Sequence, residues 1–304
     1  MLDGMRRRDL LSIVSAGLLL GSLIKPAAAS GPASVIRRRR YVDARWGQVH
    51  VTTTAPANAR AVRPPLVCLP FTPRSGRDFD EFAQQFATDR NVHCPDLPGY
   101  GGSDAPPAPP SLEEYAAALH EALDQLEPTR RTAFDLFGQH TGAALSIELA
   151  IQRPQRIRRL VLLGVPMFEA EELARVRAEF AKPRPYFEDP DFLARIWKRD
   201  LAALDLGLDR EKMLLRFTEI MRSGTRSWWG FNAVFNYAIR DKLTRVEQPV
   251  LTIALNESLG PASREAAGLV RNGRVLELAD LSGAAMDFAP GRIAAATRTF
   301  LDAP

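Results

Sequence analysis

The chain has 304 residues, a formal net charge of +4 and a hydrophobic content of 46%. This length suits one large α/β domain, and the apolar fraction is high enough to fill a core, which excludes a globally disordered chain. So small a net charge gives no reason to expect nucleic acid as a partner. The basic run Arg37–Arg40 is short and weakly specific, and we interpret it as solvated charge.

The first 29 residues have the three parts of an export signal. Arg6–Arg8 form a basic start, and Leu10–Ile24 form an apolar stretch that is short for a membrane span. Ala27–Ala29 then supply the small residues of a cleavage site. The run Arg7–Leu11 resembles the twin-arginine export motif, which has two arginines, any residue and two apolar residues.

Such a leader predicts a periplasmic or secreted protein that meets the twin-arginine translocase during export. The alternative, an uncleaved membrane anchor, agrees less well with the small-residue site. The sequence leaves open whether translation begins at Met1 or at Met5. No later segment contains about 18 unbroken apolar residues, so we expect no permanent membrane span.

Beyond the leader, strand patterns alternate with helix patterns. Strands are expected at Arg38–Arg45, Gln48–Thr54, Leu66–Leu69, Val92–Cys94, Thr132–Phe137, Arg159–Leu163, Val250–Leu255 and Val275–Leu278. Helices are expected at Phe79–Ala87, from Ser111 until Pro128, and at Ala143–Gln152, Ser263–Val270 and Arg292–Leu301. Ser111 and Glu114 have the spacing of a capping box. This alternation predicts a mostly parallel sheet with helices on both faces.

The stretch between the strands at 159–163 and 250–255 differs in character, because it is helical, rich in Arg and aromatic residues, and has little strand pattern. We interpret it as an inserted lid. The expected organisation is a twin-arginine-type signal peptide at 1–29, the first part of an α/β core at 30–166, a helical lid at 167–240 and the last part of the core at 241–304.

Three local patterns point to one family. The first is the turn-rich run Pro95–Asp104, and the second runs from Asp135 through a sharp turn into Arg153–Leu162. The third is the order of lid, strand and C-terminal helix. Over about residues 40–302 the chain resembles the α/β-hydrolase superfamily, in its lid-containing, hydrolase-1-like form. The resemblance implies that superfamily's eight-stranded fold, with hydrolysis of an ester-like bond as the default activity.

The sharp turn matches the family's nucleophile elbow, G-x-Nu-x-G, through Gly138 and Gly142. In this elbow the nucleophile has a positive φ, and small residues two positions to either side avoid clashes. The nucleophile position holds His140 instead of Ser, Cys or Asp. Histidine tolerates positive φ better than most residues, so the turn is expected to form although its chemistry has changed.

The other two triad positions are also empty. The resemblance places Ser258 at the acid position and Gly283 at the histidine position, while the neighbouring Glu257 would substitute for the acid if the register shifts. The family's chain order is nucleophile, acid, histidine. The histidines of the chain are His50, His93, His120 and His140, and none follows the elbow. The usual triad is therefore impossible, whatever the local alignment.

The oxyanion hole of the family needs two backbone N–H groups. Thr141 can supply one, and Phe71 or Thr72 can supply the other. Pro70 has no N–H and Phe71 lacks the freedom of glycine, so this loop is expected to sit differently from the family's usual His-Gly. Trp228 and Trp229 are expected to pack the lid or to line its pocket.

Metals and cofactors are not expected, because no metal-ligand spacing is found among the histidines, the two cysteines and the nearby acids. Cys68 and Cys94 fall on strands that neighbour each other in the family's fold. An oxidising compartment permits a disulfide, but cross-strand geometry is demanding, so buried free thiols are the better prediction.

Three functions remain open, of which the third is a structural partner of another exported protein. One is a divergent hydrolase in which His140 serves as a general base on a small, mainly apolar substrate; a covalent nucleophile without a partner acid is less favoured, and proton abstraction also suits a lone base. The second is a catalytically inactive pseudoenzyme that binds a ligand or a protein. The enzyme would hold a small-molecule substrate between lid and core, and the pseudoenzyme would hold a ligand or a protein partner there.

Overall fold

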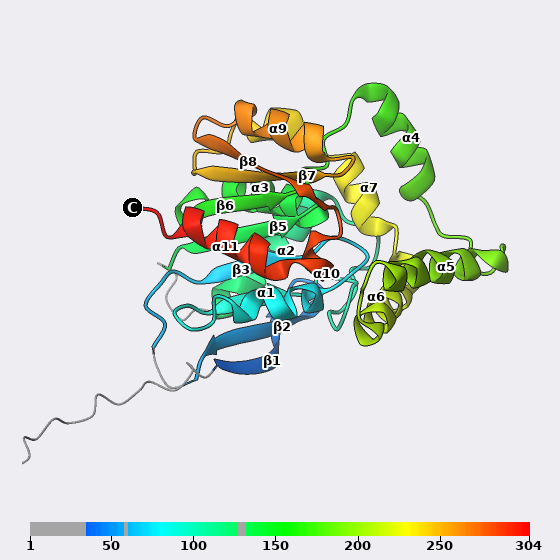
Figure 1. Ribbon diagram of the computed structural model, residues 1–304, viewed down its shortest axis with the longest axis horizontal. Coiled ribbons are helices and arrows are strands. Elements are labelled where there is room, and N and C mark those ends of the chain that lie inside the picture. Colours follow the sequence, from blue (N-terminus) through cyan, green and yellow to red (C-terminus); the bar gives the residue numbers. More distant parts are fainter. Residues whose placement is uncertain (1–34, 58–59, 127–131) are drawn as a thin grey trace, which may run out of the picture. The chain divides into compact units, whose positions relative to one another are not determined.

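The computed structural model describes residues 35–57, 60–126 and 132–304, so the export signal predicted at 1–29 lies outside the described residues. Within them, eight strands form one sheet in the order β1-β2-β4-β3-β5-β6-β7-β8 (Figure 1). The strands are β1 (Val35–Ala44), β2 (Gly47–Pro56), β3 (Leu66–Leu69), β4 (Val92–Pro95), β5 (Phe134–Gln139), β6 (Ile157–Leu163), β7 (Val250–Asn256) and β8 (Gly273–Ser282).

Pairing in this sheet is antiparallel from β1 to β2 and from β2 to β4, and parallel from β4 through β8. The inner parallel strands are covered on both faces, so β3 is fully buried and β6 is buried except at its two arginines. The edge strand β8 is mostly exposed or half-buried. The predicted mostly parallel, eight-stranded α/β fold is confirmed.

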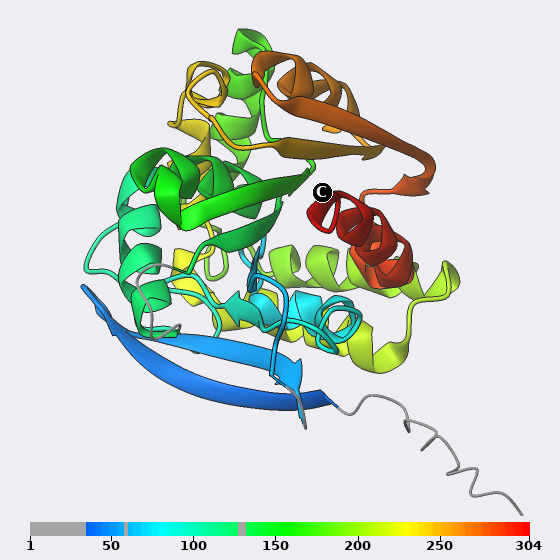
Figure 2. The same ribbon diagram turned by 90° about the vertical axis from the view of Figure 1, so that its left-hand side faces the viewer.

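Helices cover both faces of the sheet. One core lies between the sheet and α2 (Leu112–Leu126), α3 (Thr141–Gln152) and α9 (Gly260–Leu269). The other lies between the sheet and α1 (Asp80–Gln84), α10 (Ala285–Phe288) and α11 (Pro290–Leu301). Figure 2 shows α2 in teal and α11 in red on opposite sides of the central green strands.

Further helices separate β6 from β7, and we call them the helical insertion. They are α4 (Ala170–Phe180), α5 (Asp191–Asp205), α6 (Arg210–Arg222), α7 (Trp229–Phe235) and α8 (Ile239–Leu243). In α5 and α6 the rings of Trp197 and Phe217 meet edge to face at 5.0 Å. No helix of the described residues is long and apolar enough to cross a bilayer.

Several predicted elements differ in extent. The expected helix at 79–87 is a 3₁₀ turn at Gly76–Phe79 followed by the short α1. The expected loop after residue 278 continues as β8, where Asn256 pairs with Ser282 after a register shift. The predicted capping box is confirmed, since the Ser111 N–H donates to Glu114 and the Glu114 N–H donates to the Ser111 hydroxyl.

The predicted free thiols are also present. Cys68 and Cys94 are buried and unbridged. Burial raises the pKa of the Cys68 thiol well above its ordinary value, with a further contribution from Cys94 beside it. A protonated, inaccessible thiol of this kind is a poor nucleophile.

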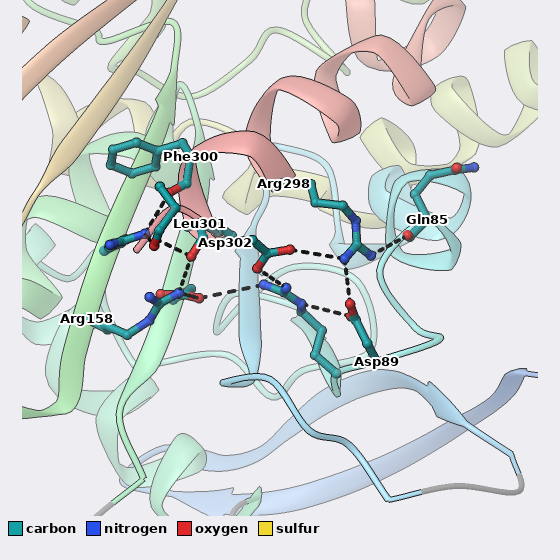
Figure 3. A network of polar contacts seen from close by, with 11 residues as sticks. Gln85, Asp89, Arg158, Arg298, Phe300, Leu301 and Asp302 are labelled. Atoms are coloured by element: carbon teal, nitrogen blue, oxygen red, sulfur yellow. Dashed lines mark hydrogen bonds and ion pairs between the residues drawn. The ribbon is translucent and has the colours of Figure 1, made fainter.

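An arginine network fixes the C-terminal helix to the sheet (Figure 3). Arg90 is fully buried and its guanidinium contacts the carboxylate of Asp302 and, at 3.2 Å, that of Asp89. Arg298 bonds both of these acids, at 2.6 Å to Asp89 and 3.2 Å to Asp302. Arg158 donates to the Leu301 carbonyl at 2.7 Å. The network therefore joins α11 to the loop before β4 and to β6.

Candidate active site

The elbow forms where the sequence places it, between β5 and α3. His140 has a φ of +48° and is the one non-glycine residue with positive φ in the described part of the chain. A Cβ on Gly138 would lie 2.2 Å from the Gly142 carbonyl oxygen, and a Cβ on Gly142 would lie 1.9 Å from that of Leu69. Neither position can hold a side chain, so the glycines permit the reversal that presents His140.

His140 has an acidic partner. Its Nε2 lies 3.4 Å from each carboxylate oxygen of Glu257, which follows β7. The His140 side chain is 26% exposed and that of Glu257 is 11% exposed, so the pair is largely shielded from water yet accessible. Imidazole with one nitrogen held by a carboxylate is a common arrangement for a base, because the carboxylate fixes the tautomer and stabilises the imidazolium.

The partner differs from what the alignment with the family suggests. Ser258, at the aligned acid position, is exposed, and Glu257 is the residue directed at His140. A Cβ on Gly283 would lie 2.4 Å from Glu257 Oε2, so the carboxylate lies against the aligned histidine position. Of the two residues considered for the acid position, Glu257 is the one beside His140, because the end of β7 directs its carboxylate toward Gly283 and the imidazole.

A third glycine supports the pair. Gly164, just after β6, has a φ of +69°, and a Cβ there would lie 2.3 Å from His140 Cδ2 and 2.8 Å from Glu257 Oε1. Gly164→Ala is expected to displace the imidazole and to lower the free energy of unfolding by about 1–2 kcal/mol through the positive φ alone. Urea denaturation checks this prediction, with Gly291→Ala, which has open space around it, as the control. Equal stability of the two variants would contradict it.

A cavity of about 280 Å³ lies in front of the pair. Besides His140 and Glu257 it is lined by Phe71, Arg74, Asp78, Gln139, Arg216, Gly283, Ala284, Met286 and Asp287. Three of its buried polar atoms, Arg74 Nε, Asp78 Oδ2 and Gln139 Oε1, have no hydrogen-bond partner among the described residues. Buried groups of this kind usually bind water or a ligand. The cavity therefore offers both donors and acceptors to a small molecule.

Burial shifts the pKa of one acid of this cavity strongly, against the effect of its ion pair. Arg74 Nη2 lies 2.8 Å from Asp78 and 3.4 Å from Asp287. Burial raises the pKa of Asp78 to about 7, although the charge of Arg74 opposes the rise. A carboxyl group with this pKa exchanges its proton near neutral pH, which is a property of acid–base sites.

The expected oxyanion donors lie close together but are mutually engaged. The Thr72 N–H donates to the Thr141 hydroxyl at 3.4 Å, and the two hydroxyls are 3.1 Å apart. Both residues are buried. The backbone N–H of Thr141 lies in the first turn of α3, where the helix itself offers no acceptor. Phe71, the third expected residue, places its ring 5.5 Å from that of His140.

A second cavity of about 460 Å³ lies between the helical insertion and the loop after β3. It shares Phe71, Arg74 and Arg216 with the first cavity. Trp228 and Trp229, expected from the sequence to pack the lid or to line its pocket, border neither of these two cavities. Their neighbours Ser227 and Phe231 do so instead, since the short helix α7 begins at Trp229 and turns other side chains inward.

The remaining histidines have structural partners. His50 Nδ1 lies 2.9 Å from Asp96, and His93 Nδ1 lies 2.9 Å from the Thr53 hydroxyl. The ring of His120 contacts the Leu149 carbonyl at 3.1 Å, and burial lowers the pKa of His120 to about 4. The described residues contain no cluster of three or more His, Cys, Asp or Glu side chains that could hold a metal ion.

Comparison with known proteins identifies the family to which the sequence is similar. The model of the α/β-hydrolase fold family matches residues 64–256, more than half of the chain. A stretch of 76 residues is 42% identical to 2-hydroxy-6-oxo-2,4-heptadienoate hydrolase of Pseudomonas putida, covering 25% of this chain and 26% of the relative. Another, of 81 residues, is 36% identical to 2-hydroxymuconate semialdehyde hydrolase of Pseudomonas sp., covering 26% and 28%. The chain thus matches about a quarter of the length of these curated relatives.

Solved structures superpose on this chain over most of its length. A hydrolase from Pseudomonas aeruginosa superposes with a TM-score of 0.68 at 23% identity, covering 87% of this chain and 98% of that one. The enol-lactonase from Burkholderia xenovorans gives a TM-score of 0.66 at 18% identity, covering 87% and 100%. At such identities the likeness concerns the fold. Together with the family match and the elbow geometry, it shows that this chain belongs to the α/β-hydrolase family.

Proposed function

We propose that this protein is a hydrolase in which His140 is the general base and Glu257 is its positioning residue. The observation that carries the proposal is the pair itself, with Nε2 of His140 3.4 Å from the carboxylate of Glu257 at the elbow of the fold. A ring held in this way is preset for proton transfer to and from a substrate in the adjoining cavity.

The chemistry follows from the orientation of the ring. When Nε2–H donates to Glu257, Nδ1 carries the lone pair and takes a proton from a water molecule. The hydroxide so formed adds to the acyl carbon of an ester-like bond. The bond to the leaving oxygen then breaks, and the imidazolium returns the proton to that oxygen. The Thr141 N–H is the backbone donor best placed to stabilise the charge that develops on the acyl oxygen.

The relatives support the reaction class. The two curated relatives described above carry the name hydrolase, and one of the two solved structures is a lactonase. The helical insertion in this proposal acts as a lid over the substrate, since the larger cavity lies between it and the core. We propose export by the twin-arginine route on the basis of the run Arg7–Leu11.

A second candidate function is ligand binding without turnover. The engaged Thr72 N–H favours it, because an oxyanion hole with one donor already bonded to Thr141 stabilises less charge. The two candidates share the cavities and differ in whether bound molecules are converted. An activity screen therefore separates them.

The screen uses the full chain and its His140→Ala variant against short acyl esters and lactones, with products followed by proton release and mass spectrometry. We expect turnover by the full chain and a loss of about 100-fold or more in the variant, the range that general bases contribute. Unchanged thermal melting serves as the folding control. Equal turnover by both proteins would refute the role of His140, and no turnover by either would favour the binding function.

A further inference from the structure

The larger cavity has an unusual charge composition. Four guanidinium groups line it, those of Arg74, Arg184, Arg199 and Arg216, against the single carboxylate of Glu179. Three of the four have acidic partners. These partners are Asp78 for Arg74 at 2.8 Å, Asp200 for Arg199 at 3.0 Å and Asp287 for Arg216 at 3.1 Å.

Arg184 is the exception. No ion pair joins it to a carboxylate of the described residues, and its one hydrogen bond there runs from Nη1 to the Glu179 carbonyl at 3.1 Å. The Glu179 carboxylate lies instead 3.7 Å from Arg175 on the outer side of α4. Burial lowers the pKa of Arg184, although the nearby Tyr186 and Glu179 oppose the fall.

Aromatic rings hold the Arg184 guanidinium in place. Its central carbon lies 5.1 Å from the ring centre of Phe180 and 5.5 Å from that of Phe231. Apart from the Nη1 bond to Glu179, its N–H groups have no acceptor among the described residues. A guanidinium presents such groups as a fork that matches a carboxylate with two hydrogen bonds. Arg184 therefore lies against two rings and forms no direct ion pair with a carboxylate in the part of the chain that the structure describes.

The walls around this charge favour a flat ligand. Five aromatic side chains line the cavity, namely Phe71, Phe180, Tyr186, Phe192 and Phe231. Rings of this kind pack best against planar, conjugated groups. A volume of about 460 Å³ accommodates a molecule with one such ring and a short chain.

We propose that Arg184 binds the carboxylate of a small planar carboxylic acid whose conjugated body lies between these rings. The inference rests on the proposed function in one respect, which is that the ligand is the substrate of the His140 site. Phe71, Arg74 and Arg216 border both cavities, so a ligand anchored at Arg184 extends toward His140. This refines the mainly apolar substrate expected from the sequence into an anionic one.

The test is isothermal titration of the full chain with cinnamate and with cinnamamide, which differ in the charge of one end. We expect cinnamate to bind at least about 10-fold more tightly, as one charge-assisted pair in a partly buried site allows. Arg184→Gln is expected to abolish this preference by weakening cinnamate alone. Arg184→Lys, which keeps the charge but not the fork, is expected to retain part of it.

Arg175→Gln, on the exposed side of the same helix region, is the matched control and is expected to bind both compounds as the unmodified chain does. Equal affinity for the two compounds, or a preference that survives Arg184→Gln, would overturn the inference. His140→Ala is expected to retain the preference for cinnamate. A chain that prefers cinnamate but turns over no ester would therefore refute the hydrolase proposal while leaving the Arg184 site in place.

Discussion

Glu257→Gln is expected to lower kcat about 100-fold with little change in KM. The amide keeps the size of the side chain but removes the charge that stabilises the imidazolium of His140, 3.4 Å away. An amide can also present its N–H₂ to the ring and favour the wrong tautomer, which in catalytic triads is among the costlier changes. Steady-state kinetics with the best ester of the screen measures the effect.

Ser258→Ala is the matched control, because Ser258 is the adjacent residue and occupies the family's aligned acid position. We expect its kcat to remain within about twofold of the unmodified chain, since exposed side chains away from the reacting atoms contribute little. A loss on Ser258→Ala together with full activity on Glu257→Gln would mean that the register at the end of β7 is shifted by one residue.

Arg90→Met is expected to lower the free energy of unfolding by about 3–5 kcal/mol, the usual cost of removing one partner from a buried ion pair. Arg90 is fully buried and faces Asp302 and Asp89, with Asp135 3.8 Å away. Burial already raises the pKa of Asp135, although Arg158 and Arg90 oppose the rise. Loss of Arg90 leaves these carboxylates with fewer cations and loosens α11. Guanidinium-induced unfolding followed by circular dichroism gives the change.

Arg292→Met provides the comparison for Arg90. Its pair with Asp280 joins side chains that are 51% and 63% exposed, so we expect a loss below about 1 kcal/mol. Similar losses for the two variants would contradict the importance that burial gives to the Arg90 network.

Much of the fold is predictable from the sequence because its signals are local. Buried parallel strands appear as short apolar runs, and the elbow needs glycines at two fixed positions, which Gly138 and Gly142 supply. The positive φ of His140 follows from the same turn. The absence of a standard triad follows from chain order alone, since no histidine comes after His140.

The partner of His140 is not predictable in the same way. Whether Glu257 or Ser258 faces the elbow depends on one residue of register at the end of β7, where the pairing with β8 shifts between Leu255 and Asn256. From the sequence, Glu257 is one of two candidates for the acid position, but no local signal favours it over Ser258. Glu257 fits beside His140 because Gly283 has no side chain to occupy that space, and this arrangement arises only in the folded chain.

The side chains that line the larger cavity are also hard to predict from the sequence. An aromatic, Arg-rich segment is visible in the sequence, but which side chains point inward depends on how short helices pack. Phe231 lines the cavity while Trp228 and Trp229 do not. Among the described residues, Arg184 lacks an ion-paired acid while Arg74, Arg199 and Arg216 each have one, and this too depends on packing rather than on composition.

The most direct test of the His140–Glu257 pair is a double-mutant cycle of kcat/KM. The four proteins are the full chain, His140→Ala, Glu257→Gln and the combined variant, all assayed with one ester. If Glu257 acts through His140, the combined variant loses no more activity than His140→Ala alone, because groups that work as a unit are not additive. Losses that multiply in the combined variant would show that the two residues act independently and would contradict the account.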